Sequence, residues 1–141
     1  MYGAEVWQIP TREINEILSI EMDVLRSARK SRMERIKNEH TKEIMGVKGK
    51  PDIIDSIERK RLQWYGHVKR MPEERIPKLI MEWIPRERRK RGRSRKMWME
   101  GVKAAMTTRN LETHQWRNRE EWRLVSGRRR KLLKKPDRQK N

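Results

Sequence analysis

The stretch that decides the fold is residues 51–70, which read PDIIDSIERKRLQWYGHVKR. Pro51 suits the first turn of a helix and the apolar residues after it recur at helical spacing, so the stretch predicts one amphipathic helix ending near Arg70. Its apolar face would comprise Ile54, Ile57, Trp64 or Tyr65, and Val68. Its basic residues, which project mostly elsewhere, are Arg59, Lys60, Arg61, Lys69 and Arg70. Such a helix can hold a nucleic-acid backbone on its basic face, although long Lys and Arg side chains also simply cover apolar surface.

Helical patterns precede this stretch. A first helix is predicted at residues 12–29, with Thr11 as its N-cap. A short second helix is predicted at residues 38–45, ending at Gly46, which suits a left-handed C-terminal cap. The apolar stripe of the first helix consists of Ile14, Ile17, Leu18, Met22 and Leu25.

The helical pattern continues after the central stretch. Residues 72–85 fit either a two-turn helix or a short strand, and we favour the helix. Ser94 can cap a helix that runs to about Thr108, and a last helix is predicted to begin after Thr113. The apolar residues of these last two helices are Trp98, Val102, Ala105, Met106, Trp116, Trp122, Leu124 and Val125.

Composition indicates a small, partly ordered domain. Leu, Ile, Val and Phe number only 26 of 141 residues, which together with high net charge is typical of disordered chains. Six Trp and nine Met can nevertheless close a small helical core. We therefore expect a mainly α fold, a small helical bundle of about four to five helices with an Arg-rich loop and a disordered basic C-terminal tail. The expected divisions are a helical region at 1–85, which the resemblance described below makes thumb-like, the basic loop at 86–96, a C-terminal helical region at 97–126 and the tail at 127–141.

The positive charge lies in the second part of the chain. The formal net charge is +18. Residues 1–57 hold 10 basic and 10 acidic groups, whereas residues 58–141 hold 28 basic and 10 acidic groups. This asymmetry indicates a polyanionic partner, most simply nucleic acid, bound with an affinity that falls steeply with salt.

The densest basic segment is residues 86–96, in which eight of eleven residues are Lys or Arg. Its self-repulsion predicts an extended loop that orders only against phosphate. A solvated linker, a nuclear-import signal and an Arg-Gly-Arg hook for the minor groove of DNA are alternative interpretations. A second basic run, residues 128–131, leads into the predicted tail.

Several classes of protein are excluded or disfavoured. The chain has no Cys, which excludes disulfide frameworks and Cys-ligated zinc sites. It has no apolar run long enough for a bilayer and no recognisable signal peptide, so we expect a soluble protein of the nucleus or cytoplasm. His40, His67 and His114 lack metal-ligand spacing, and we find no carboxylate pair on an apolar strand for phosphoryl transfer. We therefore predict no catalytic residue, metal or cofactor, and no small-molecule substrate.

Residues 61–71, RLQWYGHVKRM, resemble the R-L-x-W-x-G-H-V-x-R-M signature of LINE-type retrotransposon polyproteins, the non-LTR endonuclease/reverse transcriptases. Further pieces match in order. Residues 2–7 resemble Y-G-[SA]-E-x-W, residues 91–95 resemble R-G-R-P-R, Trp98 resembles the Trp after it, and residues 119–123 resemble the closing D-R-x-x-W-R. The resemblance covers residues 2 to about 125. It departs from the family at Ser94, where Pro is usual, and at Glu120 or Glu121, where Asp is expected.

The resemblance implies a role in copying RNA into DNA. In the family the polymerase palm precedes the Tyr-Gly-Ala-Glu segment, so this chain resembles a remnant of a truncated element that begins after the palm, and primer extension is expected to be undetectable. The implied role is a thumb and template-gripping extension. The nucleic-acid-binding candidates are Arg59, Arg61, Lys69, Arg70, Arg88, Arg89, Lys90, Arg91, Arg93, Arg95 and Lys96. The structural candidates are Trp64, Gly66, His67, Trp83, Trp98 and Trp122, with His67 a hydrogen-bonding residue and Trp64 alternatively a base-stacking one.

The sequence thus predicts a non-catalytic, RNA/DNA-binding C-terminal segment of a retrotransposon reverse transcriptase. Its expected partners are RNA, an RNA/DNA hybrid or DNA, and the missing palm and fingers are a further candidate. The alternative is a stand-alone or domesticated helical module that binds a protein partner and uses its basic run for nuclear import.

Overall fold

The computed structural model describes residues 3–28, 36–83 and 97–130, which form helices joined by turns and contain no strand. This confirms the predicted mainly α class. The elements are, in order, η1 (Ala4–Val6), α1 (Thr11–Ser27), α2 (Asn38–Ile44), α3 (Ile53–Lys69), α4 (Ile76–Glu82), α5 (Trp98–Arg109), η2 (Gln115–Arg117) and α6 (Arg119–Ser126). The described residues contain six α-helices, one in each of the six segments for which a helix was predicted or favoured above, which exceeds the overall expectation of four to five.

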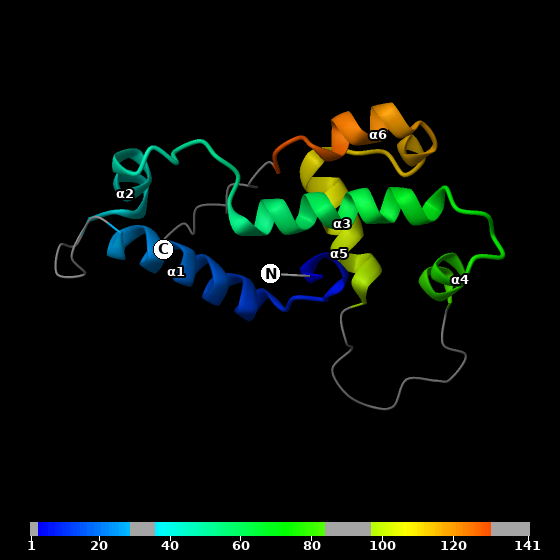
Figure 1. The fold of residues 1–141 in the computed structure, drawn as a ribbon, viewed down its shortest axis with the longest axis horizontal. Helices are drawn as coiled ribbons and strands as arrows, with labels where there is room; N and C mark the ends of the chain where they lie inside the picture. The colour runs from blue at the N-terminus through cyan, green and yellow to red at the C-terminus, as the bar shows by residue number, and fades with distance from the viewer. Residues whose placement is uncertain (1–2, 29–35, 84–96, 131–141) are drawn as a thin grey trace, which may run out of the picture.

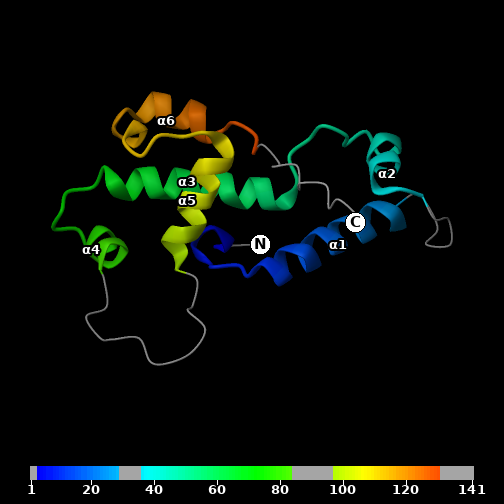
Figure 2. The same ribbon diagram turned by 180° about the vertical axis from the view of Figure 1, so that it is seen from behind.

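Helix α3 is the element on which most of the others pack. It runs through the middle of the molecule, α5 crosses it, α6 lies above it and α1 below (Figure 1). It contacts η1, α1, α4, α5, η2 and α6, whereas α2 packs on α1. The same arrangement is visible from behind (Figure 2). The stretch quoted at the outset is therefore the centre of the fold.

An aspartate rather than the expected proline starts α3. The Asp52 carboxylate accepts the backbone N–H of Asp55 at 2.7 Å, which makes Asp52 the N-cap. Satisfying this otherwise unpaired N–H fixes the first helical turn. Pro51 consequently lies before the cap and outside the first turn, which corrects the sequence prediction.

Two apolar clusters pack along α3. The larger one joins α3 to α5 and α6 and consists of Leu62, Tyr65, Val102, Ala105, Met106, Trp122 and Val125. The smaller one consists of Ala4, Ile54 and Ile57, with Ile9, Ile14, Ile17 and Leu18 packed against it. The predicted inner face of α3 is confirmed, and Tyr65 rather than Trp64 is its buried aromatic residue. Burying one such large side chain stabilises the fold by about 1.5–3 kcal/mol.

The two N-terminal helices have the predicted positions with small shifts. Helix α1 begins at Thr11 because Pro10, in an extended conformation, occupies the N-cap position and its carbonyl accepts the N–H of Ile14. Helix α2 ends at Ile44, and Gly46 after it has a φ of 65°. That left-handed conformation is the one predicted from the glycine.

The C-terminal helices differ more from expectation. Residues 72–85 contain a helix, α4, and not a strand, whereas Ser94, the expected cap of α5, lies outside the described residues. The predicted last helix is divided into η2 and α6, because the Asn118 side chain accepts the N–H groups of Glu120 and Glu121 and starts a new helix there. Leu124, expected in an apolar stripe, is 76% exposed.

The two basic segments fall largely outside the described residues. This holds for the predicted loop at 86–96 and for residues 131–141 of the predicted tail. Residues 128–130, which were assigned to the disordered tail, are instead held against the fold. The Arg128 carbonyl accepts the Nε–H of Arg109 at 2.9 Å, and Arg130 pairs with Asp52 at 2.6 Å.

Candidate nucleic-acid interface

Arg61, a predicted nucleic-acid contact, is buried inside the fold. Its Nε donates to the Glu5 carbonyl at 3.3 Å and its Nη2 donates to the Trp7 carbonyl at 2.6 Å, and the residue is 7% exposed. Burial lowers the pKa of its guanidinium, while the nearby Glu58 carboxylate acts in the opposite direction. The prediction therefore needs correction: Arg61 attaches the N-terminal segment to α3 and is not available to a phosphate.

Gly66 is the point where α6 approaches α3. A Cβ atom built on Gly66 would lie 2.1 Å from Nε1 of Trp122, far inside van der Waals contact. The Trp122 ring is 2% exposed, and its Nε1 donates to the Leu62 carbonyl at 2.9 Å. The glycine thus makes room for the indole, and the indole hydrogen bond fixes α6 on α3.

The start of α5 is attached to the same part of α3. Trp98 Nε1 donates to the Glu5 carbonyl at 3.0 Å, the same oxygen that Arg61 contacts. The Trp98 ring meets the Trp64 ring edge to face, with centroids 5.3 Å apart. Residues 61–71 therefore hold η1, α5 and α6 together, which is an architectural role.

The other three basic candidates on α3 also have partners within the chain. Lys69 Nζ donates to the Glu82 carboxylate at 2.6 Å and ties α4 to α3. Arg70 Nη1 donates to the Trp116 carbonyl at 2.6 Å and ties η2 to α3. Arg59 lies 3.9 Å from Asp55, and its side chain is 38% exposed. These side chains are thus held in place by contacts within the fold.

Two of the structural candidates lie on the surface. His67 was expected to be a structural, hydrogen-bonding residue, but it is exposed and makes no hydrogen bond to another described residue. Trp83 was expected to pack in the core, but it is 67% exposed. The reason in both cases is position: His67 faces away from the apolar side of α3, and Trp83 follows α4, which buries none of its residues.

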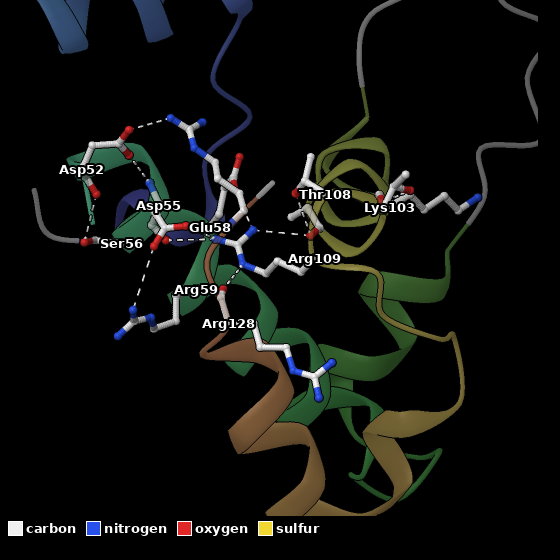
Figure 3. Close-up of polar contacts among 12 residues, drawn as sticks. Asp52, Asp55, Ser56, Glu58, Arg59, Lys103, Thr108, Arg109 and Arg128 are labelled. Carbon is white, nitrogen blue, oxygen red and sulfur yellow. Dashed lines mark hydrogen bonds and ion pairs between the residues drawn. The ribbon is translucent and has the colours of Figure 1, made fainter. Parts of the chain in front are cut away.

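Arg109, Asp55 and Glu58 form a buried cluster of ion pairs that was not predicted from the sequence (Figure 3). The Arg109 side chain is fully buried and pairs at 2.7 Å with both Asp55 and Glu58. It therefore joins the end of α5 to the first turns of α3. In the sequence, Asp52 and Asp55 are typical of acidic residues that complement the dipole at a helix start, and Arg109 is indistinguishable from any basic residue at a helix end. No local signal could have paired them.

A groove with basic walls lies between α3 and α6. It is lined by Gln63, His67, Arg70, Arg119, Trp122 and Arg123 and has a volume of about 410 Å³; we call it the α3–α6 groove. No carboxylate is among these lining residues. Burial, and secondarily the positive charge of Arg119, lowers the pKa of Arg70. Arg119 and Arg123 were not predicted as binding residues, because nothing in the sequence shows that their face of α6 lies beside α3 and lines a groove with it.

A second, apolar hollow of about 510 Å³ lies on another side of α3. Its lining includes Trp64, Ile76, Ile80, Trp83 and Trp98. Ile76, Ile80 and Trp83 are each more than two-thirds exposed. We call this the tryptophan hollow.

The remaining binding candidates cannot be placed. Arg88, Arg89, Lys90, Arg91, Arg93, Arg95 and Lys96 lie outside the described residues. Within the described ranges, no three His, Cys, Asp or Glu side chains come together as metal ligands. The helices of that part of the chain are also too short or too polar to cross a membrane.

Comparisons with known proteins add one relationship. No protein-family model matches the chain, and no solved structure matches it. The chain is similar to a transposon-derived protein. That protein, an uncharacterized one from Caenorhabditis elegans, is 25% identical over 119 residues, which cover 79% of this chain and 41% of the worm protein. The chain spans less than half the length of this relative, and the similarity connects it with sequence of transposon origin.

Proposed function

We propose that the chain is the nucleic-acid-binding C-terminal segment of a LINE-type retrotransposon reverse transcriptase, without polymerase activity of its own. The observation that carries the proposal is basic charge that the fold does not neutralise. Residues 58–141 contain 28 basic and 10 acidic groups. The carboxylates that pack against the helices, those of Asp52, Asp55 and Glu58, already pair with Arg109 and Arg130. Arg61 and Lys69 also bond within the fold. The basic groups that remain in excess are available to a polyanion, and nucleic acid is the simplest one.

The LINE assignment is supported by how the resembling motifs meet in space. Residues 2–7, 61–71 and 119–123 are far apart in sequence. In the fold Arg61 binds the carbonyls of Glu5 and Trp7, and Gly66 receives the ring of Trp122. Motifs that contact one another in the fold are expected to occur together in the same sequence. The similarity to a transposon-derived protein agrees with a retrotransposon origin.

In this role the helical unit would grip a template RNA, an RNA/DNA hybrid or DNA, as the thumb of the parent polymerase does. The candidate contacts are Arg59, Lys69, Arg70 and the basic run Arg88 to Lys96. Arg61 leaves this set because its donors are used internally. The palm and fingers of the parent protein are the further proposed partner.

The test is a binding titration of the purified chain against an RNA hairpin, an RNA/DNA hybrid and duplex DNA. It is repeated from about 50 to 200 mM salt, over which binding through several phosphates falls by orders of magnitude. Preference for the hybrid with a steep salt dependence is the expected result. Absence of binding to all three at the lowest salt concentration would refute the proposal.

One observation favours the alternative, a helical module that binds a protein and uses its basic run for nuclear import. The tryptophan hollow exposes several large apolar side chains together, and such patches commonly mark protein interaction sites. The same titration separates the two functions, because a protein-binding module would not show tight, salt-dependent binding to nucleic acid.

A further inference from the structure

We infer that the α3–α6 groove binds consecutive phosphate groups of a nucleic-acid strand. The inference rests on the proposed function and gives it a location within the described residues. It shares only Arg70 with the interface expected from sequence, and it adds Arg119 and Arg123, which were not predicted. The groove therefore combines one α3 cation with two from α6.

The two helices supply regularly spaced polar walls. Gln63, His67 and Arg70 lie four and three residues apart on α3, and Arg119 and Arg123 lie four apart on α6. Residues at these spacings share a helix face, so each wall presents a row of side chains. The ring of Trp122 lines the groove, but its Nε1 is already bonded to the Leu62 carbonyl. The donors available to a ligand therefore come from the walls.

The residues that line the groove carry an excess of positive charge, and none of these lining residues is a carboxylate. Among the residues that the structure describes, the guanidinium groups of Arg119 and Arg123 have no ion-pair or hydrogen-bond partner. Arg70 is fixed by one bond, from Nη1 to the Trp116 carbonyl, and its other guanidinium nitrogens have no partner within residues 3–28, 36–83 and 97–130. Burial is the main cause of the lowered pKa of Arg70, and repulsion by the positive charge of Arg119 adds to it. An anion between the walls would relieve this repulsion.

The chemistry of the walls favours phosphate. Guanidinium groups bind phosphate through paired, charge-assisted hydrogen bonds. Arg119 and Arg123 are separated by about 6 Å along the helix axis, at 1.5 Å per residue, so they reach different anionic groups more readily than one. This spacing favours a chain of phosphates over a single free phosphate ion.

The test compares two double variants of the full chain that lose the same charge. Arg119→Gln/Arg123→Gln removes cations from the groove. Arg75→Gln/Lys103→Gln is the matched control, because both residues are exposed and neither lines the groove. Each is titrated with a fluorescent RNA/DNA hybrid over about 50 to 200 mM salt, and losing two phosphate contacts should reduce the slope of log affinity against log salt by about two.

We expect the groove variant to show that slope change and an affinity on the order of tenfold lower or worse, with an unfolding curve like that of the wild type. Equal weakening of both variants would mean diffuse attraction to net charge; it would overturn the groove and leave the proposed function standing. A wild-type chain that does not bind at all would overturn both.

A competition experiment distinguishes the source of the phosphate. Inorganic phosphate is added to the bound hybrid, with chloride at matched ionic strength as the reference. We expect both salts to displace the hybrid equally, because one free ion cannot replace several linked contacts. Displacement by phosphate well beyond that by chloride would identify a single-anion site and overturn the inference of a strand.

Discussion

The Gly66→Ala variant provides the sharpest test of how α6 is held on α3. The added methyl group would occupy space that belongs to the Trp122 indole, with 2.1 Å to Nε1 and 2.4 Å to Cδ1. No side-chain torsion of alanine can relieve this, so the ring must move. Moving the ring breaks the 2.9 Å bond from Nε1 to the Leu62 carbonyl.

The magnitude follows from three effects. Overpacking of a dense core costs about 1–3 kcal/mol. Leaving a buried donor or acceptor unpaired costs about 1–3 kcal/mol. Alanine favours a helix interior over glycine by about 1 kcal/mol, which offsets part of the loss. We therefore expect the free energy of unfolding to fall by about 3 kcal/mol, a large share of the stability of a small domain.

The assay is urea denaturation followed by tryptophan fluorescence, analysed with a common slope. Gly127→Ala is the matched control. Gly127 has an ordinary φ of −76°, and an added Cβ would lie no closer than 3.4 Å to its nearest neighbours. The control should stay within about 0.5 kcal/mol of the wild type. If Gly66→Ala were as stable as the wild type or more stable, as helix propensity alone predicts, the packing of Trp122 on Gly66 would be wrong.

Four further results are expected. Arg61→Met should lower the free energy of unfolding by about 2 kcal/mol, because two buried carbonyls lose a charged donor. The salt dependence of nucleic-acid binding should stay the same. Loss of nucleic-acid binding with normal stability would show that Arg61 contacts the nucleic acid after all. Trp64→Ala should cost about 2 kcal/mol through its lost contact with Trp98, and an unchanged melting curve would place Trp64 free on the surface. The hydrogen bond from Lys69 lowers the pKa of Glu82 below its ordinary value of 4.5, so this contact stabilises the fold above pH 4.5 and the stabilisation is lost as the pH falls through the lowered pKa. An NMR titration should show the pKa of Glu82 returning to its ordinary value in Lys69→Met. Identical titration curves for the variant and the wild type would contradict the Lys69–Glu82 pairing. Changing Arg88, Arg89, Arg91 and Arg93 to Ala should weaken RNA binding and flatten its salt dependence, and unaltered affinity would exclude the basic run from the interface.

The central helix could be predicted because its information is local. Ile54, Ile57 and Val68 recur at helical spacing, and that periodicity alone places them on one buried face. Gly46 could be predicted for the same reason, since a single residue type suits the left-handed conformation there. The positions of the neighbouring helices on α3 carry no such local signal.

The role of Arg61 could not be predicted because it depends on distant backbone. The carbonyls that accept its hydrogen bonds lie 56 and 54 residues away, and a basic residue beside other basic residues is typical of an exposed face. Arg119 and Arg123 show the reverse case. They resemble ordinary exposed cations until α6 is placed against α3, when they come to face Arg70 across a groove.

Trp83 was expected to be a packing residue. Large apolar residues usually are buried, but α4 is too short and too peripheral to bury its own residues. The result is an apolar surface that composition alone does not reveal. An exposed aromatic residue of this kind needs the tertiary arrangement to be recognised.

The most direct test of the central claim is an NMR titration of the isotopically labelled full chain with a short RNA/DNA hybrid at about 50 mM salt, where phosphate contacts are strong. The account predicts that the backbone amides of residues 63–70 and 119–123 and the guanidinium signals of Arg70, Arg119 and Arg123 change first, while the Arg61 Nε–H signal stays in place. Changes confined to the indole signals of Trp64 and Trp83, or no change in any signal, would contradict it.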